Sequence, residues 1–180
     1  MALGATVHHF EIGLSDVDRG VYETLDLRVA RHPSESMRWL LLRTLAYCLA
    51  YEEGIGFSKG GLSASDEPPI AVHDPTGVRR AWIDVGSPGA DRLHRAAKAT
   101  PRVAIFTADL AAVRREAAAR AIHKAESIEV WVIGGPLLGQ LEEVVGKSAK
   151  LDVLRNDGGL YVTLGATTYE GTIERATILG

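Results

Sequence analysis

Disulfide chemistry is the first thing that this 180-residue sequence lacks. It contains one cysteine, Cys48, so no intrachain disulfide can form and a reducing compartment is expected. No apolar stretch approaches the roughly 20 residues that a helix needs to cross a bilayer. The first 14 residues have no basic head, apolar block or small-residue cleavage site of a secretory signal. We therefore expect a soluble, cytoplasmic protein.

An excess of charge of either sign is also missing. The chain carries 20 Lys and Arg against 23 Asp and Glu, a formal net charge of −3. This balance excludes a protein coated with basic residues that binds nucleic acid by bulk charge, but it allows a local basic face. The length, together with the absence of repeats, low-complexity tracts and Pro/Ser-rich linkers, predicts a single domain over residues 1–180.

Several familiar catalytic and binding motifs are absent as well. The sequence has no GxGxxG or GxxxxGK[ST], which excludes the usual glycine-rich phosphate cradles as a basis for function. It has no HExxH and no cysteine pair with zinc spacing, and His8 and His9 have no partner cluster. No GxSxG occurs, so nothing supports a serine hydrolase.

Periodicity and turn chemistry predict the order β-β-α-β-β-α-β-α-β-α-β-β. Strands are expected at residues 7–14, 25–30, 70–73, 80–85, 103–106, 128–133, 151–154 and 160–164, with a further strand at 167–178. Helices are expected at residues 33–54, 91–100, about 107–124 and 137–145. The order predicts an α/β protein, in which helices flank a mixed β-sheet.

Glu35 stands at the start of the strongest helical pattern, in line with Trp39 and Leu42 on its apolar stripe. A carboxylate on that stripe is costly unless it is paired, hydrogen-bonded or bound to a cation. A second interpretation is purely local. With His32 as the cap and Pro33 as the first helical residue, Glu35 takes the third position, where a capping-box carboxylate belongs. The residues leave both interpretations open.

Two further acidic positions draw attention. Asp66 and Glu67 lie where a polar loop enters a strand, at the mouth of the expected sheet, although adjacent loop acids are commonly just solvated. Asp84 lies between Ile83 and Val85 inside an apolar strand, where aspartate has poor β-propensity. Strand alternation turns it to the opposite face from those neighbours, which could be a wet face. Because Trp82 shares that face, a functional interpretation of Asp84 is favoured.

Basic residues follow directly in the segment 91–102, where four Lys or Arg stand against Asp91, a local net charge of +3. On a helix, Arg92, Arg95 and Lys98 cover one arc, opposite an arc of Leu and Ala. A solvated helix face gives the same pattern.

At these residues the sequence resembles the YaeQ family, bacterial proteins of about this length. The resemblance runs from the N-terminus to about Val162. The segments that carry it are ARHPSE at residues 30–35, DEP at 66–68, WIDVGSP at 82–88, RLHRA at 92–96 and VAIFT at 103–107.

The family resemblance implies a variant of the PD-(D/E)XK nuclease fold, here with an added N-terminal hairpin. Mapped onto this sequence, the acidic site of that fold falls on Glu35, Asp66 and Asp84. Hard carboxylate oxygens from three elements suit Mg²⁺ or Mn²⁺. Such an ion activates a water and stabilises the leaving oxygen in phosphodiester hydrolysis.

Two departures from the family motif bear on activity. The motif lysine is expected two residues after Asp84, but that position is Gly86. In YaeQ-type sequences a lysine on the following helix takes its place, and the matching residue here is Arg95, which can hold phosphate but cannot act as a base near neutral pH. Relatives usually carry glutamate at the position of Asp84, whose shorter side chain alters the metal geometry.

Two functions therefore remain as hypotheses. The first is a metal-dependent nuclease, with Glu35, Asp66 and Asp84 as ligands and Arg95 on phosphate. The second is a non-catalytic protein on a nuclease scaffold, which binds nucleic acid or a protein partner in a regulatory role. The missing motif lysine and the acidic balance favour the second.

Overall fold

The computed structural model describes residues 4–59 and 66–180. The chain forms two compact units, each built from segments that are not continuous in sequence. The first unit comprises Met1–Leu49 and Gly134–Ile173, and the second comprises Ala50–Ile133 and Glu174–Gly180. The single domain expected over residues 1–180 stays a prediction.

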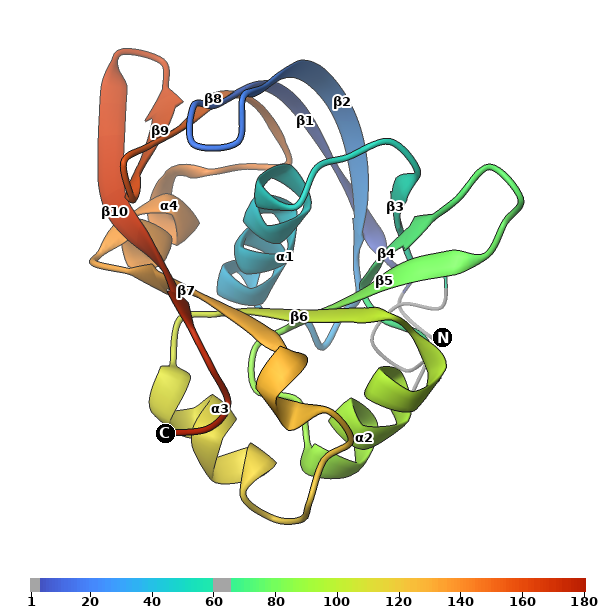
Figure 1. The fold of residues 1–180 in the computed structure, drawn as a ribbon. Coiled ribbons are helices and arrows are strands. Elements are labelled where there is room, and N and C mark those ends of the chain that lie inside the picture. Colours follow the sequence, from blue (N-terminus) through green and yellow to red (C-terminus); the bar gives the residue numbers. More distant parts are fainter. Residues whose placement is uncertain (1–3, 60–65) are drawn as a thin grey trace. The chain divides into compact units, whose positions relative to one another are not determined.

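The first unit is built on a mixed sheet with the strand order β2-β1-β8-β9-β10 (Figure 1). Its strands are β1 (Thr6–Asp16), β2 (Val21–Arg31), β8 (Ser148–Asn156), β9 (Gly159–Leu164) and β10 (Thr167–Ala176). Strands β1 and β2 form the expected N-terminal hairpin, while β1 and β8 run parallel. Alternation along β1 buries Phe10, Ile12 and Leu14 on one face.

Two helices of the first unit, α1 (Met37–Leu49) and α4 (Leu137–Val144), contact one another. Helix α1 begins four residues later than predicted, because Ser36 is its cap: the Ser36 hydroxyl accepts the backbone N–H of Trp39 at 3.1 Å. Glu35 therefore precedes the helix, and the interpretation that places it at the third helical position is wrong. Most of α1 is buried, so its burial extends well beyond a narrow stripe.

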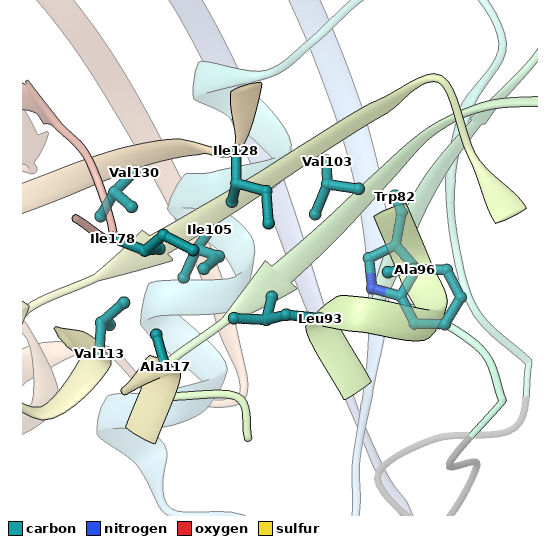
Figure 2. Packing of buried hydrophobic residues seen from close by; sticks show 10 residues of the cluster. All are labelled: Trp82, Leu93, Ala96, Val103, Ile105, Val113, Ala117, Ile128, Val130 and Ile178. Atoms are coloured by element: carbon teal, nitrogen blue, oxygen red, sulfur yellow. The ribbon is translucent and has the colours of Figure 1, made fainter. Parts of the chain in front are cut away.

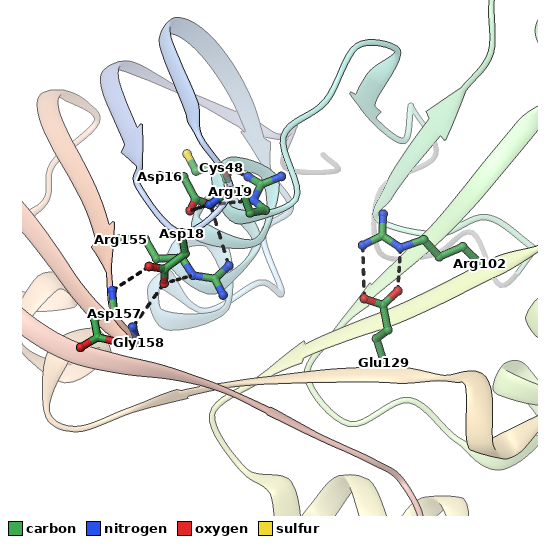
Figure 3. Close-up of polar contacts among 9 residues, drawn as sticks. All are labelled: Asp16, Asp18, Arg19, Cys48, Arg102, Glu129, Arg155, Asp157 and Gly158. Atoms are coloured by element: carbon green, nitrogen blue, oxygen red, sulfur yellow. Dashed lines mark hydrogen bonds and ion pairs between the residues drawn. The ribbon is translucent and has the colours of Figure 1, made fainter.

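The turns of the first unit are fixed by carboxylates, as Figure 3 shows. Asp157 and Gly158 both have positive φ, the geometry of a two-residue hairpin turn, which confirms the hairpin expected from Asn-Asp-Gly-Gly. Asp18 accepts the backbone N–H groups of both residues, at 2.7 and 3.2 Å, and the Arg155 Nε–H at 3.1 Å. The Asp18 carboxylate thus holds the β8–β9 turn against the β1–β2 turn.

The second unit has the strand order β7-β6-β5-β4-β3. Its elements are β3 (Ile55–Phe57), β4 (Ile70–His73), β5 (Arg79–Val85), α2 (Ala90–Ala99), β6 (Arg102–Thr107), α3 (Leu110–Ala117), the 3₁₀ turn η2 (Ala125–Ser127) and β7 (Glu129–Gly134). Strands β3, β4 and β5 form an antiparallel meander, and β5, β6 and β7 are parallel. The Arg102–Glu129 ion pair joins β6 to β7 (Figure 3).

Helices α2 and α3 cover the same face of this sheet through one hydrophobic cluster (Figure 2). Its members are Trp82, Leu93, Ala96, Val103, Ile105, Val113, Ala117, Ile128, Val130 and Ile178. Asp109 caps α3 by accepting the N–H of Ala112, and the helix ends at Ala117, well short of the expected residue 124. In the segment after α3, Ile122 packs against the cluster and Ile128 is one of its buried members.

The α/β architecture with mixed sheets and helices is therefore confirmed. In the part of the chain that the structure describes, no helix is both long enough and apolar enough to cross a membrane.

Candidate carboxylate–arginine site

Asp84 lies near the end of β5 and is almost completely buried, with 2% of its surface exposed. Strand alternation places it on the face of Trp82, whose indole N–H donates to Asp84 Oδ2 at 2.8 Å. The Arg92 guanidinium donates from Nε to both carboxylate oxygens at 3.0 Å, and Nη2 lies 3.0 Å from Oδ1. The wet-face interpretation of Asp84 is therefore wrong, since its carboxylate is enclosed and engaged by two named partners.

Burial is the main influence on the Asp84 carboxyl group, and it raises the pKa above the ordinary value for aspartate. The charge of Arg92 and the hydrogen bonds from Trp82 and Arg92 act in the opposite direction and offset part of this rise. Arg92 is thus the charge that offsets part of the cost of burying this carboxylate.

Arg92 also ties Asp84 to the loop that carries Asp66. Its Nη2 donates to the backbone carbonyl of Glu67 at 2.8 Å, and its guanidinium lies over the Trp82 ring at 5.2 Å from the centroid. Asp66 itself is an exposed turn residue directly before Glu67. The structure therefore connects the Asp66–Glu67 loop with Asp84, and the connecting group is a guanidinium cation.

The backbone conformation explains why Gly86 occupies the position of the missing motif lysine. Gly86 has φ of +87°, a conformation that L side chains rarely adopt, while its N–H donates to the Phe106 carbonyl at 2.9 Å. A lysine here would strain the connection from β5 to α2. Arg95, the residue expected to replace the lysine, is exposed on α2, one turn beyond Arg92.

Glu35, the third expected ligand, belongs to the first unit. It is 4% exposed, and Arg43 Nη2 lies 3.0 and 3.2 Å from its two carboxylate oxygens. The same nitrogen donates to the Ala30 carbonyl at 2.8 Å. Burial raises the pKa of Glu35, and the charge of Arg43 opposes that rise. The requirement that a carboxylate here be paired is thus met by an arginine from α1.

The three expected metal ligands are distributed over the two units: Glu35 belongs to the first, and Asp66 and Asp84 belong to the second. Across residues 4–59 and 66–180, no three His, Cys, Asp or Glu side chains are grouped to hold a metal. Asp84 and Glu35 each direct their oxygens at a guanidinium. Binding of Mg²⁺ or Mn²⁺ to Glu35, Asp66 and Asp84 stays a prediction, and at Asp84 it would require Arg92 to withdraw.

Arg43 and Arg92 are the site residues whose role as carboxylate partners was not predicted from the sequence. A signal for Arg92 exists: it precedes the buried Leu93 in the first turn of the helix that follows Asp84, at the border between the charged and apolar arcs. Arg43 lies within the apolar run of α1, where a cation needs a partner as much as Glu35 does. Matching buried charges of opposite sign would have suggested both pairs.

A second feature of the second unit is a group of exposed cations on α2, on α3 and in the segment that follows α3. The segment 91–124 contains eight Lys or Arg and three Asp or Glu, a net charge of +5 within a chain of net charge −3. We call its exposed cations the α2–α3 basic face; they are Arg95, Lys98, Arg115, Arg120 and Lys124. Asp91 is paired with Arg120 at 2.7 Å, and the His123 N–H donates to His94 Nδ1, so the segment after α3 is fixed to α2.

The fold and the site together define an α/β protein with mixed sheets. Two of its expected site carboxylates, Glu35 and Asp84, are buried, and each is paired with an arginine. The chain belongs to the YaeQ family: the family model described as "YaeQ protein" matches residues 1–173, beyond the point near Val162 to which the resemblance was expected to run.

Relatives and solved structures agree with this assignment. The chain is 30% identical over 167 residues to "Uncharacterized protein YaeQ" of Salmonella typhi and 28% identical to its namesake in Escherichia coli (strain K12), with 91% of each chain covered. The crystal structure of the YaeQ protein from Pseudomonas syringae is 30% identical, with a TM-score of 0.84 and 96% of both chains covered. That from Xanthomonas axonopodis pv. citri is 27% identical, also with a TM-score of 0.84, and covers 96% of this chain and 98% of its own.

Proposed function

We propose that this protein binds nucleic acid through phosphate contacts without cleaving it, on a scaffold of the PD-(D/E)XK type that the YaeQ resemblance implies. The observation that carries the proposal is the α2–α3 basic face. Three of its exposed cations, Arg95, Lys98 and Arg115, lie on helices that share one core cluster. The other two, Arg120 and Lys124, lie in the segment after α3 that is fixed to α2. Phosphate backbones are bound by such local clusters of Lys and Arg even when the whole chain is acidic.

The arrangement around Asp84 supports binding without cleavage. A nuclease of this type needs carboxylate oxygens that are free for an ion and a lysine close to the scissile phosphate. Here Asp84 receives hydrogen bonds from Arg92 and Trp82, and the motif position is a glycine with positive φ. Arg95 is suited to hold phosphate but not to act as a general base.

The test is fluorescence anisotropy with labelled single- and double-stranded DNA and RNA, in EDTA, over a series of salt concentrations. We expect binding that survives EDTA and weakens steeply with salt. For duplex DNA, each phosphate contact contributes a slope of about 0.9 in log K against log salt concentration. Two to four contacts would therefore give a slope of roughly −2 to −4.

A matched pair of variants locates the surface. Arg95→Glu with Lys98→Glu reverses two charges on the basic face, and Arg28→Glu with Lys150→Glu reverses two exposed charges on the first unit. We expect the first pair to weaken binding at least tenfold and the second to weaken it less than threefold.

Two outcomes would overturn the proposal. Absence of binding at low salt would leave a protein partner as the alternative. Cleavage in Mg²⁺ or Mn²⁺ that Asp84→Asn abolishes would establish the nuclease hypothesis instead.

A further inference from the structure

A small hollow in the second unit lies over neighbouring residues of its antiparallel strands. Gly56 of β3 pairs with Ala71 of β4, which pairs with Trp82 of β5. The two small residues of this row, Gly56 and Ala71, both line the hollow. An added Cβ on Gly56 would meet no described atom within 4 Å.

This hollow has a volume of about 270 Å³. That is just below the roughly 300–1,000 Å³ of pockets that enclose drug-sized ligands, so it suits a smaller molecule or the end of a chain. It is too small for a nucleic-acid duplex.

Arg79 is one of the basic residues that line the hollow. Its guanidinium lies 5.2 Å from the Trp82 ring centroid, and its Nε is buried without a hydrogen-bond partner in the described chain. Arg79 lines the hollow, and since its Nε makes no hydrogen bond within the described chain, that end of the guanidinium is not committed to a protein acceptor. The neighbouring Arg80 differs, because Asp74 pairs with it at 3.0 Å.

The charges around the hollow define the acceptor. Lys59, His73 and Arg79 contribute basic groups to its lining. Glu67 is the only carboxylate in the lining that the structure describes, and it accepts a hydrogen bond from Ser58 Oγ at 2.7 Å. A compact anion with several acceptor oxygens satisfies an arginine fork and a lysine together, and a phosphomonoester carries close to two negative charges at neutral pH.

We infer that this hollow is a binding site for a phosphomonoester group, with Arg79 as its principal ligand. The site is separate from the α2–α3 basic face and does not depend on the proposed nucleic-acid binding. The phosphate could come from a small metabolite or from the phosphorylated end of a nucleic-acid strand, because both present the same group.

Isothermal titration calorimetry on the full chain tests the inference with five probes. These are inorganic phosphate, adenosine 5′-monophosphate, adenosine, and an oligonucleotide with or without a 5′-phosphate. We expect at least one phosphorylated probe to bind and adenosine not to bind. A preference for the monophosphate over the phosphorylated oligonucleotide identifies a metabolite site, and the reverse identifies a strand-end site.

Three variants and a control make the test specific. Arg79→Gln should weaken phosphate binding at least tenfold, whereas Arg80→Gln on the same strand should change it less than twofold. Gly56→Val fills the hollow at a position without positive φ and should also weaken binding at least tenfold. Glu67→Gln removes the opposing charge and should strengthen binding severalfold.

The inference is overturned if no phosphorylated probe binds at millimolar concentration, or if Arg79→Gln and Arg80→Gln have equal effects. If Arg79→Gln does not fold, Gly56→Val decides the question, and unchanged binding in that variant rejects the site. Arg95→Glu with Lys98→Glu should leave phosphomonoester binding intact. Failure of this site and failure of the proposed nucleic-acid binding are therefore distinguishable.

Discussion

Arg92→Met is the most direct perturbation of the candidate site, because it removes the guanidinium and keeps the apolar stem. In the variant, Asp84 stays enclosed and retains the hydrogen bond from Trp82, but it loses its counter-charge. Removing one partner of a buried ion pair typically costs about 3–5 kcal/mol. The Arg92 side chain is 22% exposed and water can reach part of the vacated space, so we expect about 2–4 kcal/mol here.

The measurement is urea and thermal unfolding at neutral pH, with Arg95→Met as the matched control. For a chain of this length, 1 kcal/mol corresponds to roughly 2–4 °C in the unfolding midpoint, so Arg92→Met should lower it by roughly 5–15 °C. Arg95 is exposed on the same helix, and its substitution should change the free energy of unfolding by less than about 0.5 kcal/mol.

The loss of stability in Arg92→Met should also depend on pH. Burial raises the pKa of Asp84 in the wild type and Arg92 opposes the rise, so the variant should have a still higher pKa. A carboxyl group whose folded pKa exceeds its unfolded value stabilises the protein when protonated, and that stabilisation is lost as pH rises through the folded pKa. The difference from wild type should therefore be largest at neutral pH and shrink as pH falls towards the unfolded pKa of about 3.9.

A double variant separates charge from packing. Asp84→Asn with Arg92→Met removes the unpaired carboxylate and should recover most of the lost stability at neutral pH. The reasoning is refuted if Arg92→Met and Arg95→Met unfold alike, or if the loss stays constant between pH 4 and pH 8.

Two further predictions concern backbone strain and thiol reactivity. Gly86→Lys, which restores the motif lysine, should destabilise the protein by about 1–2 kcal/mol in urea unfolding because of the positive φ, and it should confer no nuclease activity in Mg²⁺; a stable, active variant would contradict this. Burial raises the pKa of Cys48 to about 12, so the native protein should not react with a thiol reagent at pH 8, and reaction should occur only at the rate of unfolding in denaturant; rapid labelling without denaturant would contradict the burial.

The features that could be predicted from the sequence are those that neighbouring residues determine. The turn at Asp157–Gly158 follows from residues that tolerate positive φ, and the shared face of Trp82 and Asp84 follows from strand alternation. The start of α1 was wrong because Pro33 suggested a first helical residue, whereas the Ser36 hydroxyl is the group that accepts a free N–H. Whether His32 or Ser36 caps the helix depends on the position and direction of the chain at the end of the preceding strand.

Which group pairs with each buried carboxylate is harder to predict from the sequence. Asp84 and Arg92 are eight residues apart on different elements, as are Glu35 and Arg43, and their pairing depends on how a helix packs on a strand or loop. The need for a partner was predictable from burial alone, but burial does not distinguish a metal ion from a guanidinium. That distinction decides between the two functional hypotheses.

The Arg92 contacts also explain how the Asp66–Glu67 loop can be held beside Asp84 without a metal. A divalent ion between acidic residues from a loop and a strand neutralises them and fixes the loop by coordination. Arg92 neutralises Asp84 through its Nε and fixes the loop through the Glu67 carbonyl, while Trp82 supports the planar group from one side. Gly86 allows the chain to turn directly from β5 towards the helix that carries this arginine. The features that depart from a nuclease motif, a glycine in place of lysine and an arginine on the carboxylate, therefore act together as one local arrangement, and that coherence is the strongest structural argument for binding without cleavage.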